Sequence, residues 1–115
     1  MPNIEKSPKP KLLDCTLRDG SYAINFQFTS EETTAICKGL ESAGIGWIEV
    51  GHGVGLCASE KGYGDAAETD ISYMEAATSG LTTARWGMFC IPGIATLDAL
   101  EKAIDHGMGF VRIGV

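Results

Sequence analysis

Short apolar runs alternate along this chain with longer stretches that have the apolar spacing of a helix. Four of the runs are short enough to be buried strands: Leu12–Thr16, Trp47–Gly51, Trp86–Ile91 and Phe110–Gly114. The stretches between them begin near residues suited to an N-cap: Thr29, Asp70 and Thr96. This alternation predicts an α/β fold in which four parallel strands are joined by three crossover helices.

The limits of the three helices follow from capping residues and apolar spacing. Thr29 and Glu32 have the spacing of a capping box, and Gly44 is suited to end the first helix. We expect Asp70 to cap a second helix that runs from Ile71 to about Thr78. Three residues of the third helix share one face, before Gly107 ends it: Leu97, Leu100 and Ile104.

Polar and glycine-rich segments complete this organisation. Residues 1–11 contain several lysines and prolines and are predicted to be a flexible leader, so that the folded unit spans 12–115. A polar turn, Leu17–Tyr22, follows the first strand. The stretch His52–Thr69 is rich in glycine and predicts a long loop after the second strand.

A weak repeat within the sequence, the internal echo, indicates which kind of α/β fold to expect. The segments 43–51 and 106–114 align without gaps, and both place Gly-x-Gly directly before a strand. The echo brings Glu49 and Arg112 to the same strand position. Repeated strand–helix units suit a barrel, and a full TIM (β/α)8 barrel takes about 250 residues. We therefore predict the first half of a TIM barrel, completed by the remaining half or by a second copy.

Composition and charge exclude several function classes. The 115 residues carry a net charge of −6, which argues against a nucleic-acid or anionic-membrane surface. The N-terminal residues have no secretory signal pattern, so we expect a cytoplasmic protein. The four cysteines form no C-x-x-C pair and are expected to be free thiols.

Candidate chemistry begins in the turn after the first strand. Arg18 and Asp19 are adjacent there, at the strand end where parallel α/β barrels place their active sites. A carboxylate at this position can bind a hard divalent cation, and a guanidinium can hold a carboxylate or a developing enolate. A salt-bridged surface turn is the alternative interpretation of the same two residues.

Two further residues stand at the end of the second strand. Glu49 interrupts an apolar run that should be buried on both faces, so it needs a partner, and Arg18 on the neighbouring strand is the obvious candidate. Glu49 is predicted to be a structural support, with proton transfer as the alternative. His52 follows the strand, and it either contacts substrate or is a loop histidine with its hydrogen bonds satisfied.

Three motifs in order resemble a known family: Asp14-Cys-Thr-Leu-Arg-Asp-Gly20, Ile48-Glu-Val-Gly-His52 and Ile91-Pro-Gly-Ile94. They resemble the DRE-TIM metallolyase superfamily of HMG-CoA lyase-like barrels, and within it the 4-hydroxy-2-oxovalerate aldolases. The resemblance runs from about Leu12 to Val115.

The resemblance implies a divalent-metal-dependent aldolase that cleaves a 4-hydroxy-2-oxo acid to pyruvate and an aldehyde. The implied metal is Mn²⁺, with Mg²⁺ or Co²⁺ as alternatives, and Asp19 matches its ligand. Arg18 matches the arginine that stabilises the enolate oxygen, and Glu49 matches the glutamate that holds this arginine. Related aldolases work beside an aldehyde dehydrogenase, which is an implied partner.

Two positions depart from the family pattern. Tyr22 stands where the family has a histidine, the base that takes the 4-hydroxyl proton, and a phenol is a weaker base at neutral pH. Tyr22 acts through a water, or the substrate differs, or the activity is lost. The family's metal site also needs a His-x-His pair from a later strand, and this sequence contains only His52 and His106. We therefore expect the 115 residues alone to be an incomplete, inactive fragment.

Two other functions remain open from the sequence. One is a Claisen-type synthase of the same superfamily, which joins an acyl-CoA to a 2-oxo acid. The other is a non-catalytic half-barrel, an assembly module or pseudoenzyme that associates to bury its strand edges.

Overall fold

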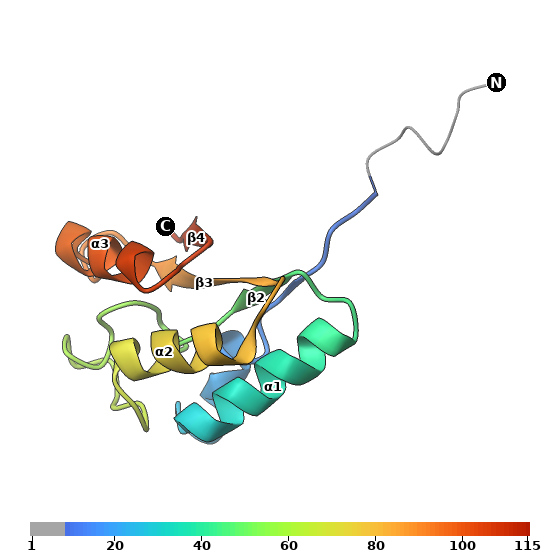
Figure 1. The fold of residues 1–115 in the computed structure, drawn as a ribbon. Helices are drawn as coiled ribbons and strands as arrows, with labels where there is room; N and C mark the ends of the chain where they lie inside the picture. The colour runs from blue at the N-terminus through green and yellow to red at the C-terminus, as the bar shows by residue number, and fades with distance from the viewer. Residues whose placement is uncertain (1–8) are drawn as a thin grey trace.

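Four parallel strands and three helices alternate along the chain, as the sequence predicts (Figure 1). The structure is a computed structural model and describes residues 9–115. The strands pair in the order β1 (Leu13–Asp14), β2 (Trp47–Glu49), β3 (Arg85–Cys90) and β4 (Phe110–Ile113). The α-helices are α1 (Ser30–Ser42), α2 (Asp70–Gly80) and α3 (Leu97–Asp105), and a 3-10 helix, η2 (Asp19–Ile24), precedes α1. Of the leader expected over residues 1–11, residues 1–8 lie outside the described part.

This arrangement confirms the α/β class with four parallel strands, which is consistent with half of a TIM barrel. β1, β2 and β4 are shorter than their apolar runs, because backbone pairing with a neighbouring strand extends over only part of each run, whereas β3 has the predicted length and begins one residue earlier. A helix returns the chain from the end of each of the first three strands to the start of the next. All four strand carboxyl ends therefore meet at one edge of the sheet.

The register gives the sheet two different faces. Glu49 lies opposite Gly87, which in turn lies opposite Phe110, so these three positions share one face. The alternate positions point towards the helices and form the core with residues of α1, α2 and α3. The buried strand residues of this core are Ile48, Trp86, Met88 and Cys90.

The first helix is capped as its sequence indicates. The Thr29 hydroxyl accepts the backbone N–H of Glu32 at 3.1 Å, and the Glu32 carboxylate accepts the backbone N–H of Thr29 at 2.9 Å. Gly44 follows with a φ of 92°, a conformation that favours glycine. The capping-box prediction is therefore confirmed.

The N-cap expected at Asp70 is wrong by one residue. Thr69 caps α2, because its hydroxyl accepts the backbone N–H of Ser72 at 3.1 Å. Asp70 is the first helical residue, and its carboxylate instead accepts the N–H of Cys57 at 2.8 Å. The helix also continues past Thr78 to Gly80, where a side chain would meet a backbone carbonyl oxygen of α1.

The third helix begins after Thr96 as predicted, but its apolar face is less buried than the pattern indicates. Thr96 accepts the N–H of Ala99 at 3.1 Å. Leu97 and Ile104 share a face and are largely exposed, whereas Ala103 provides the buried contact with the core.

The segment between β2 and α2 is a loop, as expected, yet it belongs to the core. Leu56, Cys57 and Ala58 are buried. The backbone N–H of Leu56 donates to the carbonyl of Phe89 on β3 at 2.9 Å. The loop is therefore fastened both to the sheet and to α2, where Asp70 binds Cys57.

The four cysteines are free thiols, and three of them are buried: Cys37, Cys57 and Cys90. Burial, with the nearby Asp14 and Glu41 carboxylates, raises the pKa of Cys37 to about 12. This thiol stays protonated at neutral pH and is unreactive. Within residues 9–115, no helix has the length and apolar character needed to cross a membrane.

Candidate active site

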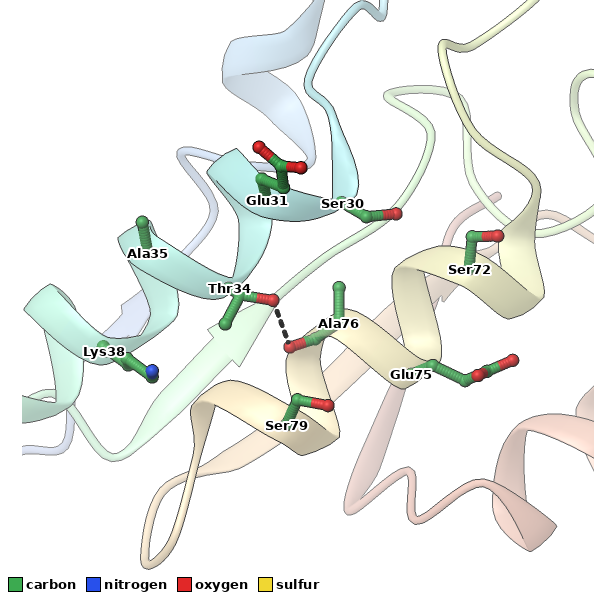
Figure 2. A pocket seen from close by; sticks show the side chains of 9 residues that line it. All are labelled: Ser30, Glu31, Thr34, Ala35, Lys38, Ser72, Glu75, Ala76 and Ser79. Carbon is green, nitrogen blue, oxygen red and sulfur yellow. Dashed lines mark hydrogen bonds between the residues drawn. The ribbon is translucent and has the colours of Figure 1, made fainter.

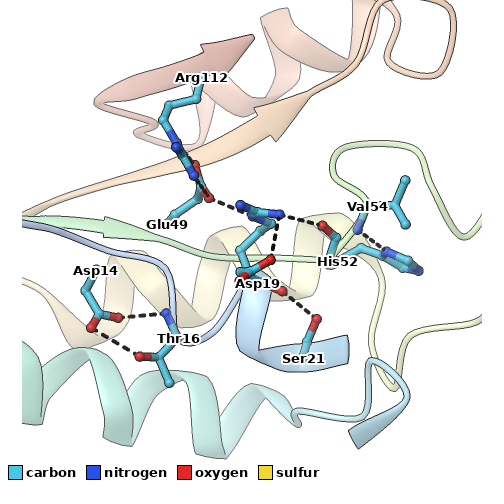
Figure 3. A network of polar contacts seen from close by, with 10 residues as sticks. Asp14, Thr16, Asp19, Ser21, Glu49, His52, Val54 and Arg112 are labelled. Carbon is cyan, nitrogen blue, oxygen red and sulfur yellow. Dashed lines mark hydrogen bonds and ion pairs between the residues drawn. The ribbon is translucent and has the colours of Figure 1, made fainter. Parts of the chain in front are cut away.

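Of the predicted site residues, Asp19, Glu49 and His52 are seen near the ends of the strands in Figure 3. Arg18 and Asp19 follow β1, Glu49 closes β2, and His52 lies three residues beyond it. The structure brings Arg18, Asp19 and Glu49 into one connected group of ion pairs. It adds Arg112 from β4, which the sequence did not single out as a site residue.

The turn after β1 is held by its own backbone and by Asp14. The Asp14 carboxylate accepts the Thr16 N–H at 2.9 Å and the Thr16 hydroxyl at 3.1 Å (Figure 3). The carbonyl of Cys15 then accepts the Asp19 N–H at 2.7 Å. The Ser21 hydroxyl donates to the carbonyl of Arg18 at 2.6 Å. These contacts direct the Arg18 side chain into the sheet edge and leave Asp19 outside.

Glu49 is completely buried and is bound by two guanidinium groups. Arg18 Nε donates to Glu49 Oε1 at 2.7 Å. Arg112 donates from Nε to Oε2 at 2.6 Å and from Nη2 to Oε1 at 2.8 Å. Burial alone would disfavour the charged carboxylate, but the hydrogen bonds and charges of Arg112 and Arg18 outweigh it and lower the pKa of Glu49. Glu49 is therefore ionised at neutral pH.

Arg18 is nearly as buried as its partner and has further contacts. Its Nη1 donates to the carbonyl of Gly53 at 3.0 Å, in the loop after β2. Its guanidinium carbon lies 4.5 Å from the centre of the Phe89 ring, within the range of a cation–π contact. The predicted pairing of Arg18 with Glu49 is confirmed as a structural contact.

Asp19 differs from Glu49 in its exposure. Its side chain is 64% exposed, and its Oδ1 lies 3.5 Å from Arg18 Nη1. An exposed carboxylate is a hard oxygen donor of the kind that Mg²⁺ and Mn²⁺ bind. Among residues 9–115, no group of three or more His, Cys, Asp or Glu side chains is placed to hold a metal ion. Asp19 can therefore supply one ligand of a metal site, with the other ligands coming from elsewhere.

His52 is buried, and both nitrogens of its ring are used within the loop. The backbone N–H of Val54 donates to His52 Nδ1 at 2.9 Å, so this nitrogen is the acceptor. The proton is then on Nε2, which lies 2.9 Å from the carbonyl oxygen of Gly64. The Phe26 ring stacks on the imidazole at a centroid distance of 4.0 Å. Of the two interpretations open from the sequence, this geometry favours the loop histidine.

Tyr22 lies on η2 and is half exposed. Its ring meets Phe26 edge-on, with the centroids 5.1 Å apart. It also packs against Gly53, because a Cβ at that position would lie 2.8 Å from the Tyr22 ring. Since the carbonyl of Gly53 binds Arg18, Tyr22 is one residue removed from the buried ion pairs.

Sequence reasoning missed Arg112 and Phe89. A signal for Arg112 was present, because the internal echo places it 63 residues after Glu49 at the same strand position. For Phe89 there was no signal, since an aromatic residue in a buried strand is ordinary. Phe89 lies beneath both guanidiniums, 4.5 Å from that of Arg18 and 5.6 Å from that of Arg112.

A cavity away from these ion pairs has a different character. A groove of about 590 Å³ lies between α1 and α2 (Figure 2). Small and polar side chains line it, and the Thr34 hydroxyl spans it by donating to the carbonyl of Ala76 at 2.9 Å. Its lining contains no cluster of catalytic or metal-binding groups, so it reflects the packing of two helices around small residues.

Comparison with known proteins finds one matching family and several similar proteins. The sequence model of the family described as HMGL-like matches residues 9–115. The chain is 45% identical over 113 residues to 4-hydroxy-2-oxovalerate aldolase 4 of Rhodococcus opacus (strain B4). The aligned residues make up 98% of this chain and 33% of that protein. It is 44% identical over 105 residues to 4-hydroxy-2-oxovalerate aldolase of Carboxydothermus hydrogenoformans, covering 91% of this chain and 31% of the relative.

A relative with another name is almost as similar. The chain is 43% identical over 107 residues to the oxaloacetate decarboxylase of Mycobacterium tuberculosis, covering 93% of this chain and 31% of that protein. The chain therefore spans about a third of the length of the curated relatives it matches.

Proposed function

Because this chain belongs to the HMGL-like family, we propose that the complete protein is an aldolase that cleaves a 4-hydroxy-2-oxo acid to pyruvate and an aldehyde. One observation carries the proposal: Arg18 is held by the buried Glu49 beside the exposed Asp19, at the strand ends of a barrel-type sheet. A fixed guanidinium next to an open carboxylate is suited to a reaction in which negative charge develops on a substrate oxygen.

Asp19 is the residue of this chain that would hold a divalent metal ion, for which we propose Mn²⁺. Its carboxylate is exposed and is a hard oxygen donor. When bound, such an ion supplies Lewis-acid polarisation of the 2-oxo acid. The remaining ligands would come from the part of the protein outside these 115 residues.

Arg18 and Glu49 have different roles in stabilising the negative charge that develops on the substrate. Breaking the bond between C3 and C4 of the substrate leaves the electron pair on the pyruvate fragment, whose carbonyl oxygen becomes an enolate oxygen. The positive charge of Arg18 stabilises this oxygen. Glu49 holds Arg18 in place before the charge develops, so little reorganisation is needed during the reaction. Protonation of the enolate at C3 then gives pyruvate.

The proton of the 4-hydroxyl must leave as the aldehyde forms, and we propose Tyr22 as the residue on its path. The phenol is half exposed and is held beside Gly53, next to Arg18. We propose that His52 supports the substrate side of the site indirectly, by fixing the loop that carries Gly53. Direct contact of His52 with substrate would require its two loop hydrogen bonds to open.

The test uses the complete protein with Mn²⁺ and 4-hydroxy-2-oxovalerate, with pyruvate measured by a coupled lactate dehydrogenase assay. We expect Asp19→Asn to abolish metal-dependent pyruvate release and Tyr22→Phe to slow it. Asp105→Asn is the matched control, because it makes the same change at an exposed position on α3. Undiminished turnover in Asp19→Asn would overturn the metal assignment, and an unaltered rate in Tyr22→Phe would remove the phenol from the proton path.

A second candidate function is the decarboxylation of oxaloacetate, the activity in the name of one relative. Loss of carbon dioxide from oxaloacetate leaves the same pyruvate enolate and needs no base for a 4-hydroxyl proton. Tyr22, a weak base where the resemblance implies histidine, favours this reaction over aldol cleavage. The same assay with oxaloacetate separates the two, because a decarboxylase releases pyruvate from oxaloacetate and not from 4-hydroxy-2-oxovalerate.

The other parts of the proposal concern partners. We propose that the open face and the free edges of β1 and β4 are covered by the remaining half of a barrel. An aldehyde dehydrogenase is the expected partner if the product is an aldehyde. Activity that requires an acyl-CoA would instead support the Claisen-type synthase, and a complete protein inactive with all three substrate classes would support the non-catalytic module.

A further inference from the structure

Arg112 makes more hydrogen bonds to the buried carboxylate of Glu49 than Arg18 does. Two of its nitrogens bind the two oxygens of Glu49, at 2.6 and 2.8 Å, in the planar fork that guanidinium and carboxylate groups form. Arg18 makes one hydrogen bond to the same group, through Nε at 2.7 Å. Figure 3 shows the contact of Arg112 with Glu49, whose Oε1 also accepts from Arg18.

The two contacts have different consequences for the carboxylate. A single hydrogen bond leaves Glu49 free to turn about its last torsion, whereas a fork fixes the plane of the group. In the observed plane, Oε1 accepts from Arg112 and from Arg18 together. The orientation that serves Arg18 is therefore set from β4, by Arg112.

Removal of Arg112 would leave Glu49 buried with one cationic partner. A buried carboxylate gains most from two parallel hydrogen bonds, so Glu49 would turn to form its own fork with Arg18. That rotation would draw the guanidinium of Arg18 away from the carbonyl of Gly53 and from Asp19, which it now contacts at 3.0 and 3.5 Å.

We propose that Arg112 is a positioning residue: by fixing Glu49, it aims Arg18 at the substrate oxygen on which charge develops. The inference rests on the proposed function, because that function gives Arg18 its task. It assigns a role to a residue that lies 63 positions from Glu49 in the sequence and two strands away in the sheet.

The test compares four variants of the complete, metal-loaded protein: Arg112→Met, Arg112→Lys, Glu49→Gln, and Glu49→Gln with Arg112→Met. We expect Arg112→Met to lower kcat roughly ten- to hundredfold, as loss of an outer partner does at metal sites, with KM changed by less than about threefold. Arg112→Lys should recover only part of the rate, because an ammonium group cannot form the fork. In the Glu49→Gln background, Arg112→Met should cost nothing further.

Arg85→Met is the matched control. It removes the same charge from the neighbouring strand β3, where the guanidinium lies 5.1 Å from the Trp47 ring and away from Glu49. Its kcat should stay within about twofold of the wild type. Equal losses in Arg85→Met and Arg112→Met would overturn the proposal in favour of a general charge effect. Additive losses, or a large rise in KM, would overturn it in favour of direct substrate binding by Arg112.

A measurement without substrate separates this inference from the proposed function. The Arg18 Nε–H group can be followed by ¹H–¹⁵N spectroscopy in the complete protein, because its hydrogen bond to Glu49 is buried. We expect Arg112→Met to shift this signal and Arg85→Met to leave it in place. An unmoved signal in Arg112→Met overturns the positioning role. A wild-type protein inactive on both 2-oxo acids refutes the proposed function, even if the signal moves.

Discussion

Replacing Glu49 by glutamine removes one negative charge from a place that water does not reach. The carboxylate is completely buried and accepts three hydrogen bonds from charged donors, at 2.6, 2.7 and 2.8 Å. In Glu49→Gln, an amide keeps one acceptor but turns its N–H₂ group towards a guanidinium. Arg112 is partly exposed and can return to water, whereas Arg18 stays buried without a counter-charge.

The size of the stability loss follows from this difference in exposure between Arg18 and Arg112. Removing one partner of a buried ion pair costs about 3–5 kcal/mol, and the partial exposure of Arg112 favours the lower end of that range. For a domain of barrel size, about 3 kcal/mol corresponds to a fall in Tm of about 6 °C or more. We therefore expect the complete Glu49→Gln protein to lose about 3 kcal/mol of unfolding free energy at pH 7.

The stability difference between the wild type and Glu49→Gln should also change with pH in a defined direction. The pKa of Glu49 is lower in the folded protein than in the unfolded chain, where it is about 4.3. The contribution of Glu49 to the unfolding free energy is therefore present above its pKa in the unfolded chain and is lost as the pH falls through its lower pKa in the folded protein. The difference between wild type and Glu49→Gln should be constant from about pH 6 to 8 and shrink below about pH 4.

The assay is urea unfolding of the complete protein at several pH values, with Glu101→Gln as the control at an exposed position of α3. We expect Glu101→Gln to change the unfolding free energy by less than about 0.5 kcal/mol. A loss below about 1 kcal/mol in Glu49→Gln, or one that does not depend on pH, would refute the reasoning that Glu49 neutralises a buried guanidinium.

Three further predictions concern the frame around the site. Hydrogen bonds from the backbone N–H groups of Ala84 and Thr83, just before β3, lower the pKa of Glu41 to about 2. Glu41→Gln should therefore lower the unfolding free energy at pH 7, and the difference should vanish as the pH falls from about 4.5 towards 2, measured by urea unfolding. A Cβ at Gly87 would overlap the carbonyl oxygen of Phe110, so Gly87→Ala should cost about 1–3 kcal/mol, whereas Gly39→Ala, with open space around it on α1, should be neutral or stabilising in the same measurement. His52→Phe removes both ring hydrogen bonds and should speed amide hydrogen exchange in the loop after β2, with the helices unaffected; unchanged exchange there would contradict the proposed support by His52.

Features that depend on local sequence were predictable. The capping box at Thr29 and the cap at Thr96 are local hydrogen-bond patterns, and both are present. The pairing of Arg18 with Glu49 was also predictable, because a carboxylate inside a buried strand needs a cation from a neighbouring strand. Asp70 was misassigned because Thr69 and Asp70 are both good caps, and the choice depends on Cys57, which is distant in the sequence.

Features that depend on register across the sheet were not predictable from one strand at a time. Arg112 and Glu49 lie on strands separated by β3, whose residue opposite Glu49 is Gly87, so their contact depends on the register of three strands. The exposure of Leu97 and Ile104 was not predictable for a similar reason. Helical spacing shows which residues share a face, but not which other element covers that face.

The loop after β2 has a consequence for how relatives of this protein can diverge. A loop that only spans two elements tolerates insertions and deletions, but this one places Leu56, Cys57 and Ala58 in the core. A change of length near those residues would pull them out of register with β3 and α2. Residues 60–65 are exposed, but the carbonyl of Gly64 lies 2.9 Å from Nε2 of the buried His52, so a change of length there would also disturb the loop. Under the proposed function, substitutions on η2, where Tyr22 is half exposed, are therefore a more accessible route to new substrate preferences than remodelling this loop.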